Sequence, residues 1–254
     1  DWSWSLGYTY TDATEVGALT SSTAGSGFGG QYNFNVNENT AGTSRYEIKD
    51  RISGALNWKH KFFGDYETKV GLVYEGRSGR PYSMIFAGDA NGDGRTFNDL
   101  FYMPSGPGDV LFGSLSNSGV FTANPQMEAD FWKWAESKKE LAGYAGTYVP
   151  ENALRSKWVN TFDVRISQDL PGFMKGHKSQ IWLDIQNIGN MINKDWGHIL
   201  DYGFNGNEAA ASLIGIDKAT GKYVYGYRSG TQFGQPGAVA VPSDGDGNTN
   251  GISQ

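Results

Sequence analysis

Apolar and polar side chains alternate along five separate segments of the chain, residues 2–10, 46–58, 66–74, 158–166 and 180–186. A period of two places the two sets on opposite faces of an extended strand, so each segment is predicted to be a β-strand. The apolar positions are Trp2, Trp4, Leu6, Tyr8, Tyr10, Ile48, Ile52, Leu56, Trp58, Tyr66, Val70, Leu72, Tyr74, Trp158, Phe162, Val164, Ile166, Ile181, Leu183 and Ile185.

The opposite face of the same segments is too charged for a buried core. It carries Arg45, Glu47, Lys49, Arg51, Lys59, Glu67, Lys69, Glu75, Arg77, Asp163, Arg165, Asp169 and Asp184. A wall that faces lipid on one side and a water-filled lumen on the other produces this pattern, and aromatic side chains at both ends of the first segment suit its two interfaces. The pattern predicts an all-β fold, an antiparallel transmembrane β-barrel.

The connections between the segments differ in length. Residues 61–65 and 171–178 form short turns, whereas residues 12–44, 78–157 and the chain after residue 190 form long connections. Outer-membrane barrels have short periplasmic turns and long extracellular loops. Structureless loops of this length also count against a compact soluble domain.

An even strand count in a closed barrel would require one more strand after the fifth segment. We therefore interpret residues 1–254 as the C-terminal portion of a larger barrel, without its plug domain and final strand. Residues 222–228 are a rival candidate for that strand, but we interpret them as a β-structured part of the last loop because Gly-rich sequence follows.

A short helix is predicted within the second long connection. Asn124 can cap it, Pro125 suits its first turn and Gly143 can end it. Phe131 and Trp134 fall on one side at helical spacing. They either pack onto the loop or the barrel mouth, or form an aromatic patch that contacts a substrate or partner.

The composition is typical of a membrane barrel and counts against a nucleic-acid-binding protein and a helical membrane protein. Aromatic residues make up 14% of the chain, and there are 36 glycines, no cysteine and a net charge of −6. The negative charge argues against nucleic acid as a partner. No apolar run approaches the roughly 18 residues of a membrane helix. The expected partner is the lipid bilayer of the bacterial outer membrane.

Short runs spread along most of the chain resemble the Oar-like TonB-dependent outer-membrane receptors. The matching runs are YTYTD (residues 8–12), LTSS (19–22), FGDY (63–66), YEGRSGRPY (74–82), DANGDG (89–94), NDL (98–100), WVN (158–160), NIGN (187–190) and NKDWG (193–197). The resemblance implies a plugged barrel of about 22 strands. It also implies coupling to the TonB complex of the inner membrane through the plug.

The run of residues 89–99 has the spacing of a calcium loop. Asp89, Asn91 and Asp93 stand at the first, third and fifth positions, followed by a glycine. Leu100 replaces the glutamate expected at position twelve, and Asp99 can substitute for it in a looser loop. The loop either binds Ca²⁺ or is an Asx- and Gly-rich turn without an ion.

Several charged residues are candidates to line the lumen or contact a substrate: Arg77, Arg80, Asp163, Arg165 and Asp184. Arg77 and Arg80 can bind a substrate carboxylate. Alternatively, they pair with lumen carboxylates such as Asp163 or Glu75.

No catalytic motif appears in the chain, and its three histidines show no ligand spacing, so an enzyme is not expected. The leading hypothesis is TonB-dependent transport of a substrate bound by the extracellular loops. A surface adhesion protein without transport and protein export through the same barrel stay open as alternatives, as does a soluble β-sandwich or sugar-binding module.

Overall fold

The computed structural model describes residues 1–17, 21–28, 30–35, 37–38, 41–174, 176–199, 202 and 206–227. Strands account for most of the regular structure, as the predicted all-β class requires. The chain divides into two units. The first unit contains residues 1–12, 48–79 and 157–199, and the second contains residues 13–47, 80–156 and 200–254.

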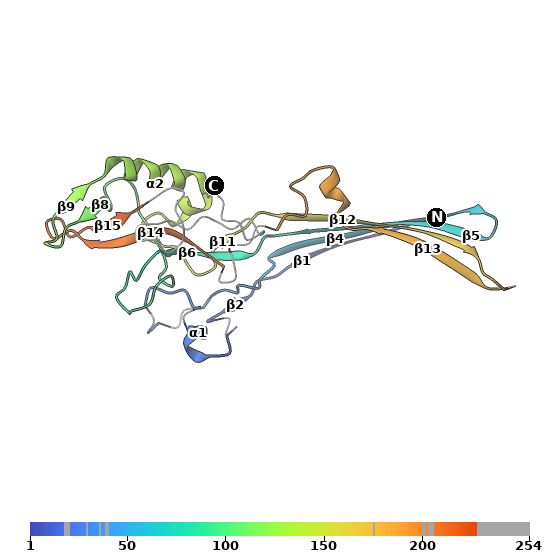
Figure 1. Cartoon of the computed structure of the whole chain (residues 1–254), viewed down its shortest axis with the longest axis horizontal. Helices are drawn as coiled ribbons and strands as arrows, with labels where there is room; N and C mark the ends of the chain where they lie inside the picture. Colours follow the sequence, from blue (N-terminus) through green and yellow to red (C-terminus); the bar gives the residue numbers. More distant parts are fainter. Residues whose placement is uncertain are drawn as a thin grey trace. The chain divides into compact units, whose positions relative to one another are not determined.

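The first unit is a five-stranded antiparallel sheet whose strands lie in the order β1-β4-β5-β12-β13. The strands are β1 (Trp2–Tyr10), β4 (Asp50–Phe63), β5 (Tyr66–Arg77), β12 (Val159–Pro171) and β13 (Lys178–Ile185). All five predicted strands therefore form, and Figure 1 shows them running side by side.

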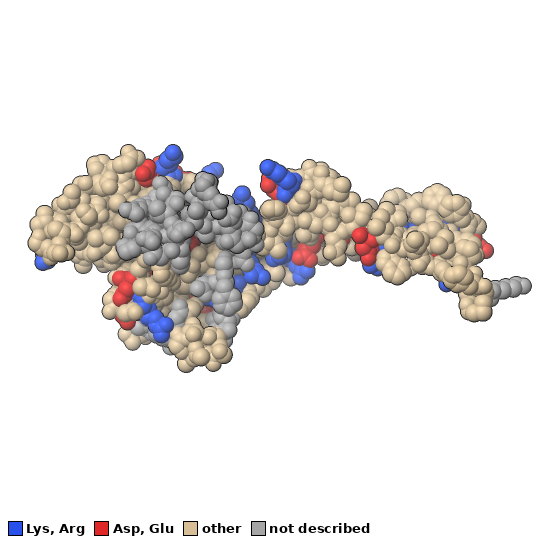
Figure 2. Space-filling model, viewed as in Figure 1, with Lys and Arg blue, Asp and Glu red and all other residues tan. Residues whose placement is uncertain are grey.

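The register of this sheet aligns the apolar positions of neighbouring strands. One row across it runs through Trp4, Leu56, Leu72, Val164 and Ile185. Because residues directly opposite one another on paired strands share a face, each sheet face is continuous across all five strands. One face is apolar, and the other carries most of the charged side chains. Figure 2 shows Lys and Arg in blue and Asp and Glu in red.

The second strand starts later than predicted. The second strand begins at Asp50 and not at residue 46, because residues 44–47 form a turn in which Glu47 N–H donates to the Ser44 carbonyl (3.0 Å). The Glu47 carboxylate accepts a hydrogen bond from Ala13 N–H and pairs with Arg155 within the second unit. Ile48 consequently lies outside the strand.

The predicted asymmetry of the connections is present. β4 and β5 are joined by a tight turn at Gly64, whose φ of 61° suits glycine, and β12 is joined to β13 by residues 172–177. Both long connections between these strands leave from the other end of the sheet, where Tyr10 pairs with Asp50 and Arg77 pairs with Val159. After β13, η2 (Ile188–Met191) leads to Trp196, whose ring stacks on Phe162 at 5.1 Å.

The long connections are not structureless, which corrects the prediction. They build the second unit around a six-stranded mixed sheet in the order β11-β6-β14-β15-β8-β9. Its strands are β6 (Pro81–Phe86), β8 (Leu111–Leu115), β9 (Phe121–Ala123), β11 (Leu154–Arg155), β14 (Asn207–Ile216) and β15 (Tyr223–Gly226). β15 belongs to this sheet, as expected for a β-structured part of the last loop; residues 228–254 lie outside the described residues.

The core of the second unit is mainly aromatic. Phe86, Phe101 and Tyr225 are buried together with ring centroids 5.1 to 5.9 Å apart. The predicted helix forms as α2 (Pro125–Ser137), capped by Asn124 through a hydrogen bond from Met127 N–H (3.1 Å). It lies along β8, where Phe131 packs 4.8 Å from Phe112, as Figure 1 shows for the two elements.

α2 ends at Ser137, before the predicted stop at Gly143, because Ser137 Oγ donates to the Trp134 carbonyl and Lys138 leaves helical geometry. A 3₁₀ helix, η1 (Lys139–Tyr144), follows. The smaller elements are α1 (Ala24–Phe28), the pair β2 (Thr14–Glu15) and β3 (Gly42–Thr43), and the pair β7 (Tyr102–Met103) and β10 (Thr147–Tyr148).

Among the described residues, no helix is both long enough and apolar enough to cross a lipid bilayer.

Candidate functional site

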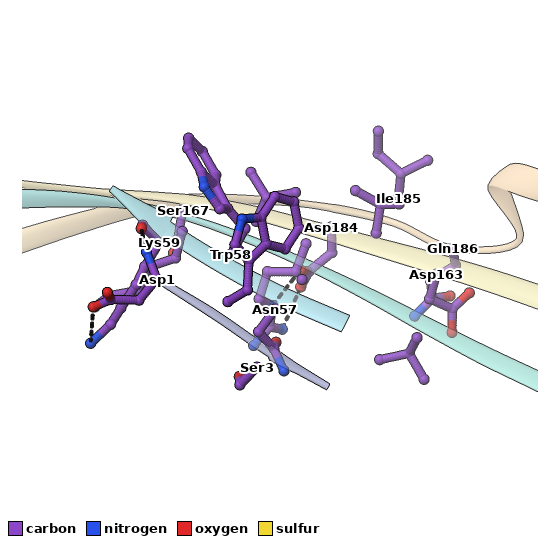
Figure 3. Close-up of a pocket in the computed structure, with 17 residues that line it drawn as sticks. Asp1, Ser3, Asn57, Trp58, Lys59, Asp163, Ser167, Asp184, Ile185 and Gln186 are labelled. Carbon is purple, nitrogen blue, oxygen red and sulfur yellow. Dashed lines mark hydrogen bonds and ion pairs between the residues drawn. The ribbon is translucent and has the colours of Figure 1, made fainter. Parts of the chain in front are cut away.

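The charged face of the five-stranded sheet forms a concave surface around a cavity of about 770 Å³. Most of the residues that line it are odd-numbered in β4, β5 and β12 and even-numbered in β13. The register of the sheet places these two sets on the same face, because successive side chains of a strand point to opposite faces. Figure 3 shows Ser3 and Trp58 on opposite sides of these strands. The polar side chains are Asp1, Ser3, Asn57, Lys59, Lys69, Asp163, Arg165, Ser167, Asp184 and Gln186.

Arg165 and Asp184 stand opposite each other on β12 and β13, and both line this cavity. Arg165 Nε lies 2.5 Å from Asp184 Oδ1, and its Nη2 lies 2.6 Å from Oδ2. Two parallel N–H donors on one carboxylate fix both side chains in a plane. The pair thus presents a neutral, rigid feature on the cavity wall.

Nearer the hairpin turns, four charged residues form a ladder across β4, β5 and β12. Lys59 and Lys69 lie 3.9 and 3.5 Å from the Glu67 carboxylate, and Lys69 also lies 3.5 Å from Asp169. The alternation in the sequence predicts that these side chains lie on the polar face. Their arrangement as a ladder depends on which residues stand opposite one another on neighbouring strands, and the sequence alone does not determine that register.

Arg77 pairs within the sheet, as one of the two alternatives proposed. Its Nε lies 3.6 Å from Glu75 Oε1, while Arg51 Nη2 lies 2.5 Å from Oε2 of the same carboxylate. Asp163 is not its partner: Asp163 Oδ1 accepts a hydrogen bond from Asn187 N–H (2.7 Å) and so holds the left-handed turn that begins η2.

Arg80 lies apart from this cavity. It belongs to the second unit, where its side chain is exposed and its carbonyl accepts a hydrogen bond from Ser156 N–H (3.0 Å). Of the five residues predicted for the lumen, Asp163, Arg165 and Asp184 line the cavity and Arg77 lies farther along the same sheet face.

Trp182 also lies on this face, although it was not among the residues predicted for it. It stands opposite Ser167 in the register, so it projects toward the charged side, and 61% of it is exposed. An indole on a polar surface is suited to stacking against a flat or sugar-like molecule. The only sign of it in the sequence is that Trp182 stands between Ile181 and Leu183, at a position where the alternation predicts a polar residue.

The predicted calcium loop lies in the second unit. Asp89 Oδ1 accepts hydrogen bonds from the N–H groups of Gly92 and Asp93, and its Oδ2 accepts one from Gly94 N–H. Asp99 Oδ2 accepts from Ala90 N–H (2.6 Å). Burial, together with the charges of Asp93 and Asp89, raises the pKa of Asp99 to about 6.

These hydrogen bonds form an Asx-rich turn, a geometry that both alternatives share. Within the described residues, no three His, Cys, Asp or Glu side chains gather as a metal site. A Ca²⁺ ion in this loop would therefore also require amide or carbonyl oxygens, which this ion accepts.

The two aromatic residues of α2 have different environments. Phe131 is fully buried in the core, which favours the packing role over a patch for a substrate. Trp134 is half-buried, and its ring lies 5.6 Å from Phe131 and 5.9 Å from Tyr227.

No protein-family model matches this chain, and neither a curated protein nor a solved structure matches it significantly.

Proposed function

We propose that the five-stranded sheet is a section of the wall of an outer-membrane β-barrel. The observation that carries this proposal is the exposed apolar face. Trp4 and Leu6 are 75% and 70% exposed, and Ile181 and Leu183 are exposed at the other edge of the sheet. Contiguous apolar surface of this kind is costly in water and is satisfied by hydrocarbon.

The layout of the apolar face supports this placement. Its aliphatic centre lies between two groups of aromatic residues, Trp2, Trp58, Phe62 and Tyr66 toward the hairpins and Tyr8, Tyr10, Tyr74 and Phe162 toward the long connections. Aromatic rings collect at the two membrane interfaces. β4, β5 and β12 have 14, 12 and 13 residues, enough to cross a bilayer core, which takes about 9–11 tilted residues.

A shallow cavity of about 370 Å³ on this face is lined by Trp2, Leu56, Trp58, Val70, Leu72 and Val164. All six side chains are apolar, so the cavity suits the acyl chain of a lipid.

Within the described residues, β1 and β13 each have one edge without a partner strand. Five strands are too few to enclose a lumen, since the smallest such barrels have about eight. Further strands are therefore part of the proposal, and they would pair with these two edges and remove the exposed backbone groups.

The charged face would line the lumen, and its cavity would belong to the path of a substrate. Its ion pairs leave little net charge on the wall, which suits a passage that carries polar molecules without holding them. The second unit, built from the long connections, would lie outside the cell and bind the substrate. We propose TonB-dependent transport and not catalysis as the activity, with energy transmitted through a plug, as the resemblance to the Oar-like receptors implies.

The membrane topology can be tested by labelling single cysteines, because the native chain has none. In cells that carry the full protein, Ser118→Cys lies in the second unit and Asp65→Cys in a hairpin turn. We expect a membrane-impermeant maleimide to label Ser118→Cys on intact cells and Asp65→Cys only after permeabilisation. Labelling of both sites in the soluble fraction would contradict the proposal.

Transport is separable from surface adhesion and from export. Small molecules retained by the detergent-extracted protein would be identified by mass spectrometry, and uptake of the same compound would be measured with and without a working TonB complex. Transport predicts TonB-dependent accumulation in the periplasm. Binding without accumulation would favour the adhesion alternative, and TonB-independent release of proteins from the cell would favour export.

A further inference from the structure

We propose that the loop of residues 89–99, together with Asn33, is a Ca²⁺-binding site that fixes residues 33–35 against residues 98–100. The inference concerns the second unit alone and does not depend on the proposed transport. It begins from the Asp89, Asn91, Asp93 spacing, but it is carried by a different observation.

That observation is an unsatisfied buried carboxylate oxygen. Asp99 is fully buried, and its Oδ1 has no hydrogen-bond partner. Its other oxygen accepts hydrogen bonds from Ala90 N–H and Asn91 N–H (2.6 and 3.3 Å), so the carboxylate points into the loop. A buried carboxylate oxygen without a donor is costly, and a hard cation is one group that satisfies it.

A second acceptor lies next to the first. Asn33 is the parallel bridge partner of Asp99, which places both side chains on the same side of the backbone. Asn33 Oδ1 is also buried without a hydrogen-bond partner. Two neighbouring oxygen acceptors that lack donors indicate a ligand that is positively charged.

The surrounding groups supply further oxygens of the kind that Ca²⁺ prefers. Asn91 and Asp93 lie beside Asn33 in the wall of a cavity of about 670 Å³. The Asn91 amide is already anchored, because its Nδ2 donates to the Phe34 carbonyl at 2.9 Å. Asp93 is exposed, which leaves the loop open to an entering ion.

The consequence of binding is mechanical. Asn33 N–H donates to the Asn98 carbonyl (3.1 Å) and Leu100 N–H to the Asn33 carbonyl (3.2 Å), and these bonds join two segments distant in sequence. An ion shared by Asn33 and Asp99 would add a second connection at the same point. Removing the ion would loosen residues 33–35 first.

The test is calorimetric titration of CaCl₂ into the full chain in detergent after treatment with EDTA, with MgCl₂ titrated in parallel. We expect one saturable Ca²⁺ site in about the 10⁻⁴ to 10⁻³ M range typical of extracellular modules. Saturating Ca²⁺ should raise the midpoint of thermal unfolding of the second unit by several degrees, and MgCl₂ at the same concentration should raise it much less.

Asp93→Ala removes an exposed ligand and two exposed hydrogen bonds, from Arg95 N–H (2.8 Å) and Asn91 Nδ2 (3.3 Å), and leaves the core intact. It should therefore weaken Ca²⁺ binding at least tenfold with little change in the EDTA-treated midpoint. Asp99→Asn should abolish binding, and Glu136→Gln, an exposed acidic residue of α2, should bind like the unchanged chain. Absence of a saturable Ca²⁺ signal would overturn the proposal. So would unchanged affinity in Asp93→Ala, because the ion would then bind elsewhere.

Discussion

Lys138 Nζ lies 2.6 Å from Glu208 Oε2 and ties the residue after α2 to the start of β14. Glu208 is 1% exposed, and burial raises its pKa while the Lys138 ammonium opposes that shift. The ammonium also lies 5.8 and 5.6 Å from the ring centres of Tyr82 and Tyr202, which stack on each other. The pair is therefore a buried ionic connection between the end of the helix and the sheet.

Lys138→Met should destabilise the second unit strongly, because it leaves the Glu208 carboxylate buried without its counter-ion. We expect a loss of about 3–5 kcal/mol in the free energy of unfolding by urea. Lys138→Met with Glu208→Gln should recover much of this loss, and Lys139→Met, the exposed neighbour, should change little. Equal small losses for Lys138→Met and Lys139→Met would mean that the pair does not stabilise the fold.

Phe131→Ala should open a cavity in the core of the second unit. Phe131 contacts the rings of Phe112, Trp134 and Tyr227, and no part of it is exposed. Truncating a buried phenylalanine costs about 3–5 kcal/mol. Lys133→Ala, at an exposed position of the same helix, should cost less than about 0.5 kcal/mol. Comparable stabilities of the two variants would argue that α2 does not dock as described.

Glu151 should make the second unit less stable as the pH rises. Burial raises the pKa of Glu151 from 4.5 to about 7, so the folded state binds the proton more tightly than the unfolded state. The free energy of unfolding should therefore fall between about pH 4.5 and 7 and then level off. Glu151→Gln should remove this slope, which amounts to up to about 2 kcal/mol after allowance for partial exposure.

The measurement is urea unfolding followed by fluorescence from pH 4.5 to 8 for both proteins. Because Asp99 has a raised pKa as well, only the difference between the two curves reports Glu151. A pH-independent difference would contradict the assignment.

The two faces of β5 should respond oppositely to a new charge. Leu72→Arg places a guanidinium on the apolar face and should destabilise the membrane-inserted form by about 2–4 kcal/mol if Leu72 lies near the middle of the bilayer. Val73→Arg, one residue later on the charged face, should cost far less. Folding into lipid vesicles, followed by the shift in gel mobility of folded barrels, would compare them. Equal losses would contradict a two-faced wall.

The alternation of the five long strands was sufficient to predict their existence and their faces, because each has one solvated side and one apolar side. Most strands of the second unit could not be predicted from alternation, for a physical reason. β6 is buried along its whole length, so Pro81, Tyr82 and Met84 show no period of two. The alanines at the centre of β14 are likewise buried and carry no polar alternation.

The candidate site was predictable to a similar extent. The sequence placed Arg165 and Asp184 on the same face, but that they pair with each other follows from the β12–β13 register. Asp163 was one of two carboxylates offered as partners for Arg77 or Arg80, and it instead accepts a hydrogen bond from the backbone N–H of Asn187. The significance of Asn33 in the loop site rests on its bridge to Asp99, a contact between residues far apart in the chain.

The most direct test of the two-faced wall compares nitroxide labels on adjacent residues of β4, an interior strand of the sheet. Leu56→Cys lies on the apolar face and Asn57→Cys on the charged face. With the full protein in phospholipid vesicles, the label at 56 should collide mainly with lipid-soluble oxygen, and the label at 57 mainly with a water-soluble nickel chelate. Equal access of the nickel chelate to both positions would contradict the membrane-wall account.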